Sequence, residues 1–375
     1  MKKFLILLVL QFCCIVIYSQ VTSTILSGVI HNRTDEIIIV AMADKDLRFH
    51  GVEIPINAEG HFQYVLKAEA IEEYNLVFQS EWKEGIWKPI LFFNDSEKIE
   101  FELFPSERFN ENIVTGSDMV DLNNSFNHKM MSSFQSDFME LDSSEPWKLD
   151  KNSEEFRVYK EKEKLLSSKM LSFIQDGFKD KPSLVGYYLY YNMMSRFIDN
   201  NILLEEYKRY GDYWSNKFPD HPLVEKVQML LISKDELKIG GHFIDFNTRT
   251  LKKENKVFRE ALQEEEYTLL DLWAPWCGPC IKKSKAVAGE WDKLSTKNLQ
   301  VFSVVGGVDT EEKGIKAIEK HNYPWSSYLE ILEENKIWEK YGLSWSGGRQ
   351  FLFNRNGKLL AINPSIEELN KILTP

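Results

Sequence analysis

The chain has 375 residues, of which 46 are Lys or Arg and 57 are Asp or Glu, so its formal net charge is −11 at pH 7. Such an acidic surplus argues against binding to nucleic acids or to anionic membranes. Aromatic residues make up 13% of the chain, which indicates packed cores rather than disorder. The length allows two or three domains.

The N-terminal segment, residues 1–19, has the pattern of a secretory signal peptide. It starts with two lysines, continues with an apolar run and offers a small residue, Ser19, at the expected cleavage point. The apolar run is short for a membrane span. Cys13 or Cys14 could belong to a lipoprotein signal, but the bulky Phe12 argues against it. We therefore expect export to the periplasm or cell envelope without a lipid anchor.

Residues 20–117 have the pattern of a β domain. Residues 37–40 form a β-branched run, and apolar residues alternate with polar ones over residues 62–66 and 99–103. Asn-, Asp- and Gly-containing turns separate these runs. We expect an all-β, sandwich-like domain with antiparallel strands, and nothing in it indicates catalysis.

Residues 118–235 have helical periodicity. Phe126, Met130 and Phe134 recur at every fourth position and predict an apolar helix face. The stretch 187–194 is rich in Tyr and Met. It could be an adaptable peptide-binding surface, although a buried core stripe is the more common meaning of such a pattern.

The most informative stretch is Trp-Cys-Gly-Pro-Cys at residues 276–280. It follows a buried-type apolar run, residues 267–273, and leads into a helical segment. A helix N-terminus presents free N–H groups and a partial positive charge, which lower the pKa of a thiol at that position. We therefore assign Cys277 as the more exposed, attacking nucleophile. Cys280, one helical turn later, is the resolving thiol.

Two other meanings of a Cys-x-x-Cys pair are a structural disulfide and half of a zinc site. Zinc requires about four ligands, and no second Cys or His pair stands near residues 277–280. The chain has four Cys, and the other two lie in the expected leader. We expect no metal site, and the mature chain would keep only the redox pair.

The strand before the motif carries a carboxylate, Asp271. Burial raises the pKa of a carboxyl group and lets it exchange protons near neutral pH; the alternative is an Asp that only bonds backbone at a strand end. Trp273 and Trp276 are expected to form walls around the sulfurs. Three lysines could add positive potential or simply form a solvated helix face: Lys282, Lys283 and Lys285.

The ten residues 271–280, Asp-Leu-Trp-Ala-Pro-Trp-Cys-Gly-Pro-Cys, resemble the active-site segment of thioredoxins. Residues 240–246 resemble the opening segment of TlpA/ResA-type thiol–disulfide oxidoreductases, and the resemblance covers residues 236–375. It implies an α/β thioredoxin fold and a reducing enzyme that uses no cofactor. In that resemblance Asp271 is the base that activates Cys280. It also implies disulfide-bearing protein substrates and a membrane thiol-reductant donor.

The sequence departs from the thioredoxin pattern at two places. A Pro usual in the active-site helix is replaced by Lys285, which predicts a straighter helix, running to about Leu294. The cis-Pro that faces the active site aligns with Gly347 or Gly348. Because cis bonds are essentially a proline property, we expect a trans, more mobile loop that forms a substrate rim with Trp273 and Trp276 and leaves the thiol pair uncovered.

The order of glycine-containing segments in residues 20–117 is similar to a domain that precedes envelope thioredoxin-like proteins, where a scaffold role is expected. Two hypotheses follow. The first is an envelope oxidoreductase that reduces protein disulfides through Cys277 and Cys280. The second is a peptide- or partner-binding module whose Cys pair is vestigial or senses oxidation. The intact Asp271 favours the enzyme, and the missing cis-Pro favours the module.

Overall fold

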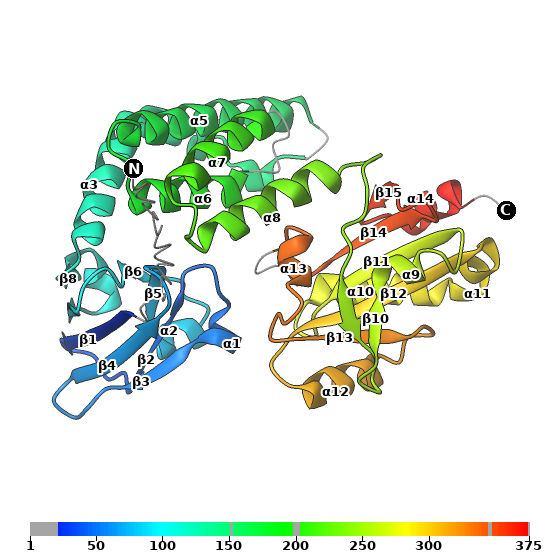
Figure 1. Cartoon of the computed structure of the whole chain (residues 1–375), viewed down its shortest axis with the longest axis horizontal. Coiled ribbons are helices and arrows are strands. Elements are labelled where there is room, and N and C mark those ends of the chain that lie inside the picture. The colour runs from blue at the N-terminus through cyan, green and yellow to red at the C-terminus, as the bar shows by residue number, and fades with distance from the viewer. Residues whose placement is uncertain (1–21, 151–152, 198–202, 344–346, 374–375) are drawn as a thin grey trace, which may run out of the picture.

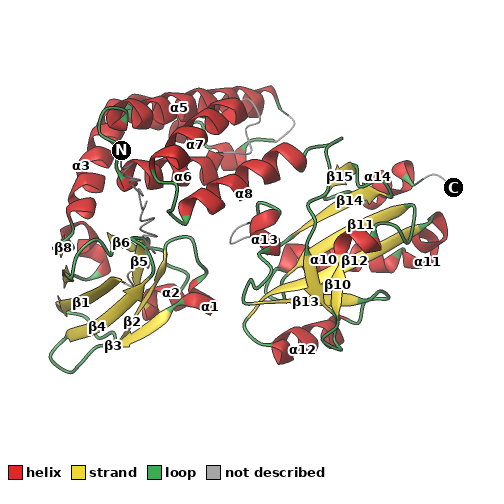
Figure 2. Ribbon diagram, in the orientation of Figure 1, coloured by secondary structure: helices red, strands yellow, loops and turns green. Residues whose placement is uncertain are grey.

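The computed structural model describes residues 22–150, 153–197, 203–343 and 347–373 (Figure 1). The expected signal peptide, with Cys13 and Cys14, lies outside these residues. Within them, no helix is long and apolar enough to cross a membrane. Strands dominate the first third of the chain, helices the middle, and both alternate in the last part (Figure 2).

The first part is a sandwich of two four-stranded sheets, with strand orders β4-β1-β7-β8 and β3-β2-β5-β6. Its strands are β1 (Thr22–Ile30), β2 (Ile37–Met42), β3 (Val52–Pro55), β4 (His61–Ala68), β5 (Glu73–Phe78), β6 (Ile90–Phe93), β7 (Lys98–Leu103) and β8 (Ile113–Thr115). Two short helices, α1 (Leu47–His50) and α2 (Gln79–Lys83), flank the second sheet. The expected sandwich is confirmed. Its strands are not all antiparallel, because β1 pairs with β7 in parallel.

The middle part contains helices that lie along one end of the sandwich (Figure 1). They are α3 (Asp118–Ser133), α4 (Gln135–Ser143), α5 (Glu154–Phe178), α6 (Leu184–Phe197), α7 (Leu204–Lys217) and α8 (Leu223–Glu236). The Tyr- and Met-rich stretch lies in α6, where Tyr187, Tyr190 and Met194 are each 0% exposed. Of its two meanings, the core stripe is therefore correct for these three residues.

The sandwich and the helices share one hydrophobic core. Phe93 of β6 packs against Tyr188 of α6 with ring centroids 5.4 Å apart. The hydroxyl of Tyr188 donates to the buried Glu72 at 2.6 Å. The boundary expected near residue 117 therefore separates two kinds of secondary structure that are packed into a single unit.

The last part is a seven-stranded sheet with the order β10-β9-β13-β12-β11-β14-β15. Its elements are β9 (Asn247–Arg249), β10 (Asn255–Val257), α9 (Phe258–Ala261), β11 (Tyr267–Trp273), α10 (Gly278–Gly289), α11 (Trp291–Leu294), β12 (Leu299–Val308), α12 (Glu311–His321), β13 (Ser327–Ile331), α13 (Ile337–Lys340), β14 (Arg349–Asn354), β15 (Leu359–Ile362) and α14 (Ile366–Ile372). Strands β11, β12 and β13 are parallel, and β14 is antiparallel to β11. This is the thioredoxin fold that the sequence predicted.

Alternation along β11 divides its side chains between the two faces of the sheet. Leu269 packs with the core under α10, α11 and α14, whereas Leu270 and Leu272 pack with α9 and α13. Asp271 therefore points to the α10 face. The expected continuous helix to Leu294 is wrong: α10 ends at Gly289, because Gly weakens a helix and the next residue has non-helical dihedral angles of φ −110° and ψ 13°.

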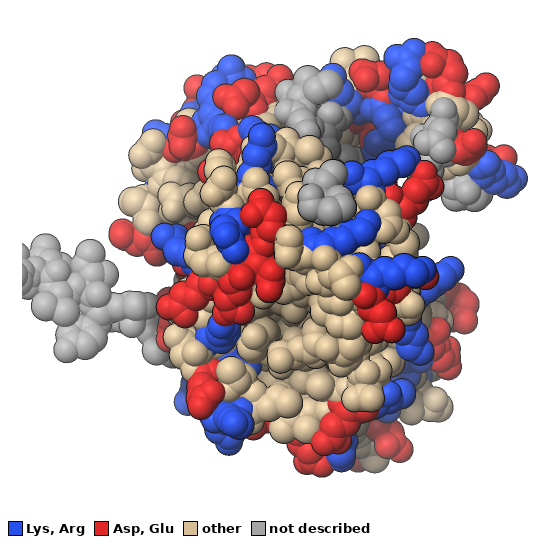
Figure 3. Space-filling view, turned by 90° about the vertical axis from the view of Figure 1, so that its right-hand side faces the viewer, with Lys and Arg blue, Asp and Glu red and all other residues tan. Residues whose placement is uncertain are grey.

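The last part contacts the middle part through α13 and α8. Lys336 pairs with Glu225 at 2.6 Å. A Cβ on Gly342 would lie 2.7 Å from the hydroxyl of Ser233, so only a glycine allows this approach. On the face drawn in Figure 3, acidic and basic side chains are interspersed around an uncharged area, so the acidic surplus forms no single-sign region there.

Candidate active site

The Cys pair lies where β11 ends and α10 begins. Cys277 is the N-cap residue of α10, and its sulfur accepts a hydrogen bond from the backbone N–H of Cys280 at 3.3 Å. The two sulfurs form a disulfide. Both residues are 9% exposed, so the expectation that Cys277 is the more exposed one is wrong. What distinguishes Cys277 is its position at the helix N-terminus, where the free N–H groups stabilise a thiolate.

Asp271 is buried behind the disulfide, with 1% exposure. Burial raises the pKa of Asp271 to about 6, against the opposing effects of hydrogen bonds from Ser284 and Gln350 and of the charge on Lys283. The hydroxyl of Ser284 lies 2.7 Å from Asp271 Oδ2, and Gln350 Nε2 donates to Oδ1 at 3.1 Å. These side-chain partners go against the alternative of an Asp that only bonds backbone.

Ser284 and Gln350 are site residues that sequence reasoning missed. Ser284 is four residues after Cys280, so it lies on the same face of α10, and its hydroxyl is 3.1 Å from the carbonyl of Cys280. Gln350 is the register partner of Asp271 across β11 and β14. An amide within the apolar run of β14 was a usable signal, because a buried polar side chain needs a partner.

The three lysines of α10 differ in environment. Lys282 and Lys285 are exposed, as expected for a solvated helix face, whereas Lys283 is half-buried. Burial lowers the pKa of Lys283; the nearby cation of Arg349 lowers it further, and Asp271 opposes both effects. Lys283 therefore places positive charge near the buried carboxylate, and Arg349 places a second cation near Lys283.

The two tryptophans of the motif occupy different places. Trp273 is 0% exposed, packs in the cluster that contains both cysteines, and donates its indole N–H to Ser303 at 2.9 Å. Because it is fully buried, Trp273 packs behind the cysteines and is not part of the expected substrate rim. Trp276 is 43% exposed and donates to the carbonyl of Gly307 at 3.2 Å, so it does offer a surface beside the sulfurs.

The loop that replaces the cis-Pro packs directly against the disulfide. A Cβ on Gly347 would lie 2.3 Å from the sulfur of Cys277, so only a glycine backbone fits there. Gly348 has φ +147°, and a Cβ on it would lie 1.9 Å from the carbonyl oxygen of Leu272. Among the described residues no peptide bond is cis, as predicted. The expectation of an uncovered thiol pair is wrong, and the rest of this loop, residues 344–346, lies outside the described residues, so its expected mobility stays a prediction.

No group of three or more His, Cys, Asp or Glu side chains in the described part of the chain could hold a metal ion. The side chains at the site offer two sulfurs at a helix N-terminus and a buried carboxylate whose pKa is raised to about 6.

Comparisons with known proteins concern the C-terminal part of the chain. Residues 248–325 match the family model of thioredoxin, which confirms the resemblance for the C-terminal part. A Streptomyces coelicolor protein described as "Putative thioredoxin 2" is 38% identical over 65 residues, which are 17% of this chain and 42% of that protein. The match thus spans less than half of that relative.

Several solved structures of similar proteins come from Bacteroides. The thioredoxin domain of a thiol-disulfide oxidoreductase from Bacteroides vulgatus is 20% identical and covers 37% of this chain and 99% of its own, with a TM-score of 0.33. A thiol:disulfide interchange protein from Bacteroides sp. is also 20% identical, covers 36% of this chain and 89% of its own, and has a TM-score of 0.32.

Proposed function

We propose that this protein is an exported thiol–disulfide oxidoreductase that reduces disulfides in proteins of the cell envelope through Cys277 and Cys280. The observation that carries the proposal is the disulfide at the N-terminus of α10 with the buried Asp271 behind it. A structural disulfide has no use for a carboxylate whose pKa is raised to about 6. A dithiol that must gain and lose protons does.

The reaction starts from the reduced pair. The thiolate of Cys277 attacks one sulfur of the substrate disulfide; a mixed disulfide forms, and the first substrate thiolate leaves and takes up a proton. Cys280 then loses its proton and attacks the sulfur of Cys277. The internal disulfide forms and the second substrate thiol leaves. Two electrons have passed to the substrate, and an external dithiol must return them.

Asp271 has the role of proton acceptor for Cys280. Its carboxylate is connected to the start of α10 through Ser284, which lies one turn after Cys280. Each oxygen of the carboxyl group accepts one hydrogen bond, Oδ2 from Ser284 and Oδ1 from Gln350, and these two bonds fix its orientation. Because its pKa is raised to about 6 by burial, Asp271 is mostly ionised at neutral pH yet basic enough to accept a thiol proton.

Two further parts of the proposal rest on the sequence. The leader-like residues 1–19 support export to the envelope. The Gly-Pro pair between the cysteines resembles reducing thioredoxins, and reduction in that compartment requires a membrane thiol-reductant carrier as electron donor. The competing hypothesis, a binding module with a vestigial pair, predicts no turnover.

The test is a turnover assay of the full mature chain with a protein disulfide such as insulin and a dithiol reductant. We expect turnover by the wild type, none by C277S, and a trapped mixed disulfide with C280S. D271N should form the mixed disulfide at a near-normal rate and resolve it about 10–100-fold more slowly at pH 7. This is at or below the lower end of the roughly 10²–10⁴-fold that a general base contributes, because Cys280 can also lose its proton to water. E330Q is the matched control, because Glu330 is also buried (2% exposed) but its carboxylate bonds Asn335 and, among the described residues, has no hydrogen bond to the active-site helix. A wild type no faster than C277S would exclude the enzyme.

A further inference from the structure

Helix α1 of the β sandwich reaches the redox site. The guanidinium of Arg48 lies 3.6 Å from the ring centroid of Trp276, the exposed tryptophan beside Cys277. Asp46, the N-cap of α1, orients Arg48: the Nε–H of Arg48 donates to Asp46 Oδ1 at 2.9 Å. A cation stacked on an indole at this distance is a favourable contact. A residue far away in the sequence thus covers part of the active-site motif.

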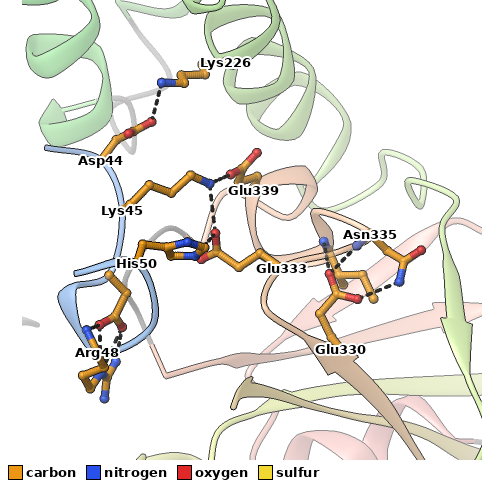
Figure 4. A network of polar contacts seen from close by, with 11 residues as sticks. Asp44, Lys45, Arg48, His50, Lys226, Glu330, Glu333, Asn335 and Glu339 are labelled. Carbon is orange, nitrogen blue, oxygen red and sulfur yellow. Dashed lines mark hydrogen bonds and ion pairs between the residues drawn. The ribbon is translucent and has the colours of Figure 1, made fainter. Parts of the chain in front are cut away.

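An ion-pair network fixes α1 in this position (Figure 4). Lys45, just before α1, contacts Glu333 at 2.9 Å and Glu339 at 2.6 Å, both from the thioredoxin part. His50 lies 3.4 Å from the same Glu333. Burial alone would raise the pKa of Glu333, but the hydrogen bonds and charges of His50 and Lys45 outweigh it and lower the pKa to about 2. The network is partly buried, with Lys45 22% exposed, so solvent screens it less than a surface pair.

Two hollows lie on either side of Arg48. The larger is a cavity of ≈ 730 Å³ whose lining includes Glu73 and Trp82 of the sandwich, Tyr191 of α6, and Arg349 of the thioredoxin part. The smaller, of ≈ 550 Å³, lies over Trp276, Pro275 and Ala317, with Phe49 of α1 as a further wall. Arg48 lines both. Each is large enough for several side chains of a ligand.

Arg349 brings an available positive charge to the larger cavity. It follows Gly347 by two residues, and Gly347 abuts the sulfur of Cys277. In the described ranges of the chain, no ion pair joins Arg349 to an Asp or Glu, and the charge nearby on Lys283 is of the same sign. A half-buried guanidinium without a carboxylate partner is suited to bind one in a bidentate manner.

We propose that the β domain completes the substrate-binding surface of the redox site, with Arg48 as the ridge between two subsites and Arg349 as the receptor for a carboxylate. The occupant is an extended, disulfide-bearing polypeptide segment with an Asp or Glu close to its reactive cysteine. One side of the segment lies in the cavity between the three parts, and the other lies over Trp276. The ion pairs of Lys45 with Glu333 and Glu339 hold α1 next to the thioredoxin part, so that Arg48 stays in contact with Trp276.

This inference deepens the proposed function and rests on it, so its test separates binding from turnover. The probes are two peptides that differ only in Glu or Gln beside the reactive position, with serine in place of cysteine. Their affinities for the oxidised full-length protein are measured by Trp fluorescence. We expect the Glu peptide to bind about 5–20-fold more tightly, the range of one charge-assisted hydrogen-bond pair. Turnover of a small neutral disulfide, measured separately, reports the proposed function alone.

Variants then test which residue causes the preference for the Glu peptide over the Gln peptide. R349Q should abolish this preference, and R349K should keep part of it. R259Q is the control and should change nothing, because Arg259 pairs with Asp245 away from the site. R48Q and K45E should weaken both peptides, and K45E/E339K, which reverses the 2.6 Å ion pair, should restore binding. Equal affinity of the two peptides in the wild type, or an unchanged preference in R349Q, would overturn the carboxylate receptor. Unchanged binding in both R48Q and K45E would overturn the role of the β domain.

Discussion

Replacing Asp271 with Asn should stabilise the oxidised protein above pH 6, although Asp271 is a site residue with two side-chain hydrogen-bond partners. Burial raises its pKa from 3.8 to about 6. A shift of roughly two units corresponds to about 3 kcal/mol of unfavourable free energy for the ionised, buried form, at 1.36 kcal/mol per unit. The group is 1% exposed, so solvent screening does not reduce this figure appreciably.

The pH dependence follows from the direction of this shift. Between pH 3.8 and about 6 the folded protein binds more protons at Asp271 than the unfolded chain, so stability falls as pH rises through this window. The cost is absent below pH 3.8 and complete above about pH 6. Asn carries no charge, so the substitution removes the free-energy cost of the buried charge. The amide can keep one bond from Ser284 and donate to Oε1 of Gln350, which has no partner among the described atoms. We therefore expect a net gain of about 2–3 kcal/mol at pH 7.5.

The assay is denaturant unfolding of the oxidised wild type and D271N between about pH 4.5 and 8. The difference between the two variants isolates Asp271, because all other titrations cancel. We expect the difference to grow from about 1 kcal/mol at pH 4.5, where roughly a third of the cost is present, to a plateau above pH 6.5. E330Q controls for the general effect of removing a buried carboxyl group. A difference that is flat across this range, or a D271N protein less stable than the wild type at pH 7.5, would refute the assignment of a desolvated carboxylate.

Three further predictions address the site and its support. C280S, which keeps only Cys277, should be alkylated faster near pH 6 than C277S, which keeps only Cys280. The reverse order of alkylation rates in a rate–pH profile would reassign the nucleophile. G347A should destabilise the oxidised protein by ~1–3 kcal/mol by overpacking, whereas G289A, with nothing within 4 Å of the added Cβ, should not; equal melting shifts would contradict the close packing. E73Q should stabilise the protein by up to about 3 kcal/mol above pH 7, since burial, opposed by Asn192, raises the pKa of Glu73 to about 7; denaturation at pH 5 and 8 checks this.

Local signals were sufficient for much of the fold and for the core of the site. The alternating runs at residues 62–66 and 99–103 lie in β4 and β7, as predicted. Each is a short segment with one clear periodicity that follows a turn. Asp271 and the Cys pair were identified because a strand, a turn and a helix start follow one another directly in the sequence.

The features that the sequence did not predict depend on contacts between distant segments. Gln350 meets Asp271 only through the register of β14 on β11, and a one-residue slip would turn it to the other face. The shared core of the sandwich and the helices depends in the same way on how α6 packs on β6. The coverage of the disulfide by Gly347 was missed for a different reason: removing a side chain was expected to open the site, but it lets the backbone itself approach the sulfur.

The glycine loop and the β domain can be understood together. The resemblance to thioredoxins implies a substrate rim built from loops of the thioredoxin part, and the loop beside Cys277 has no side chain at Gly347. The opposite side of Trp276 carries a side chain from another part of the chain, Arg48. In the proposed substrate path, Arg48 of the β domain thus offers a side-chain contact that Gly347 cannot offer. Because Lys45 holds that domain in place through two carboxylates, substrate selectivity should depend on an interface that includes no sulfur chemistry at all.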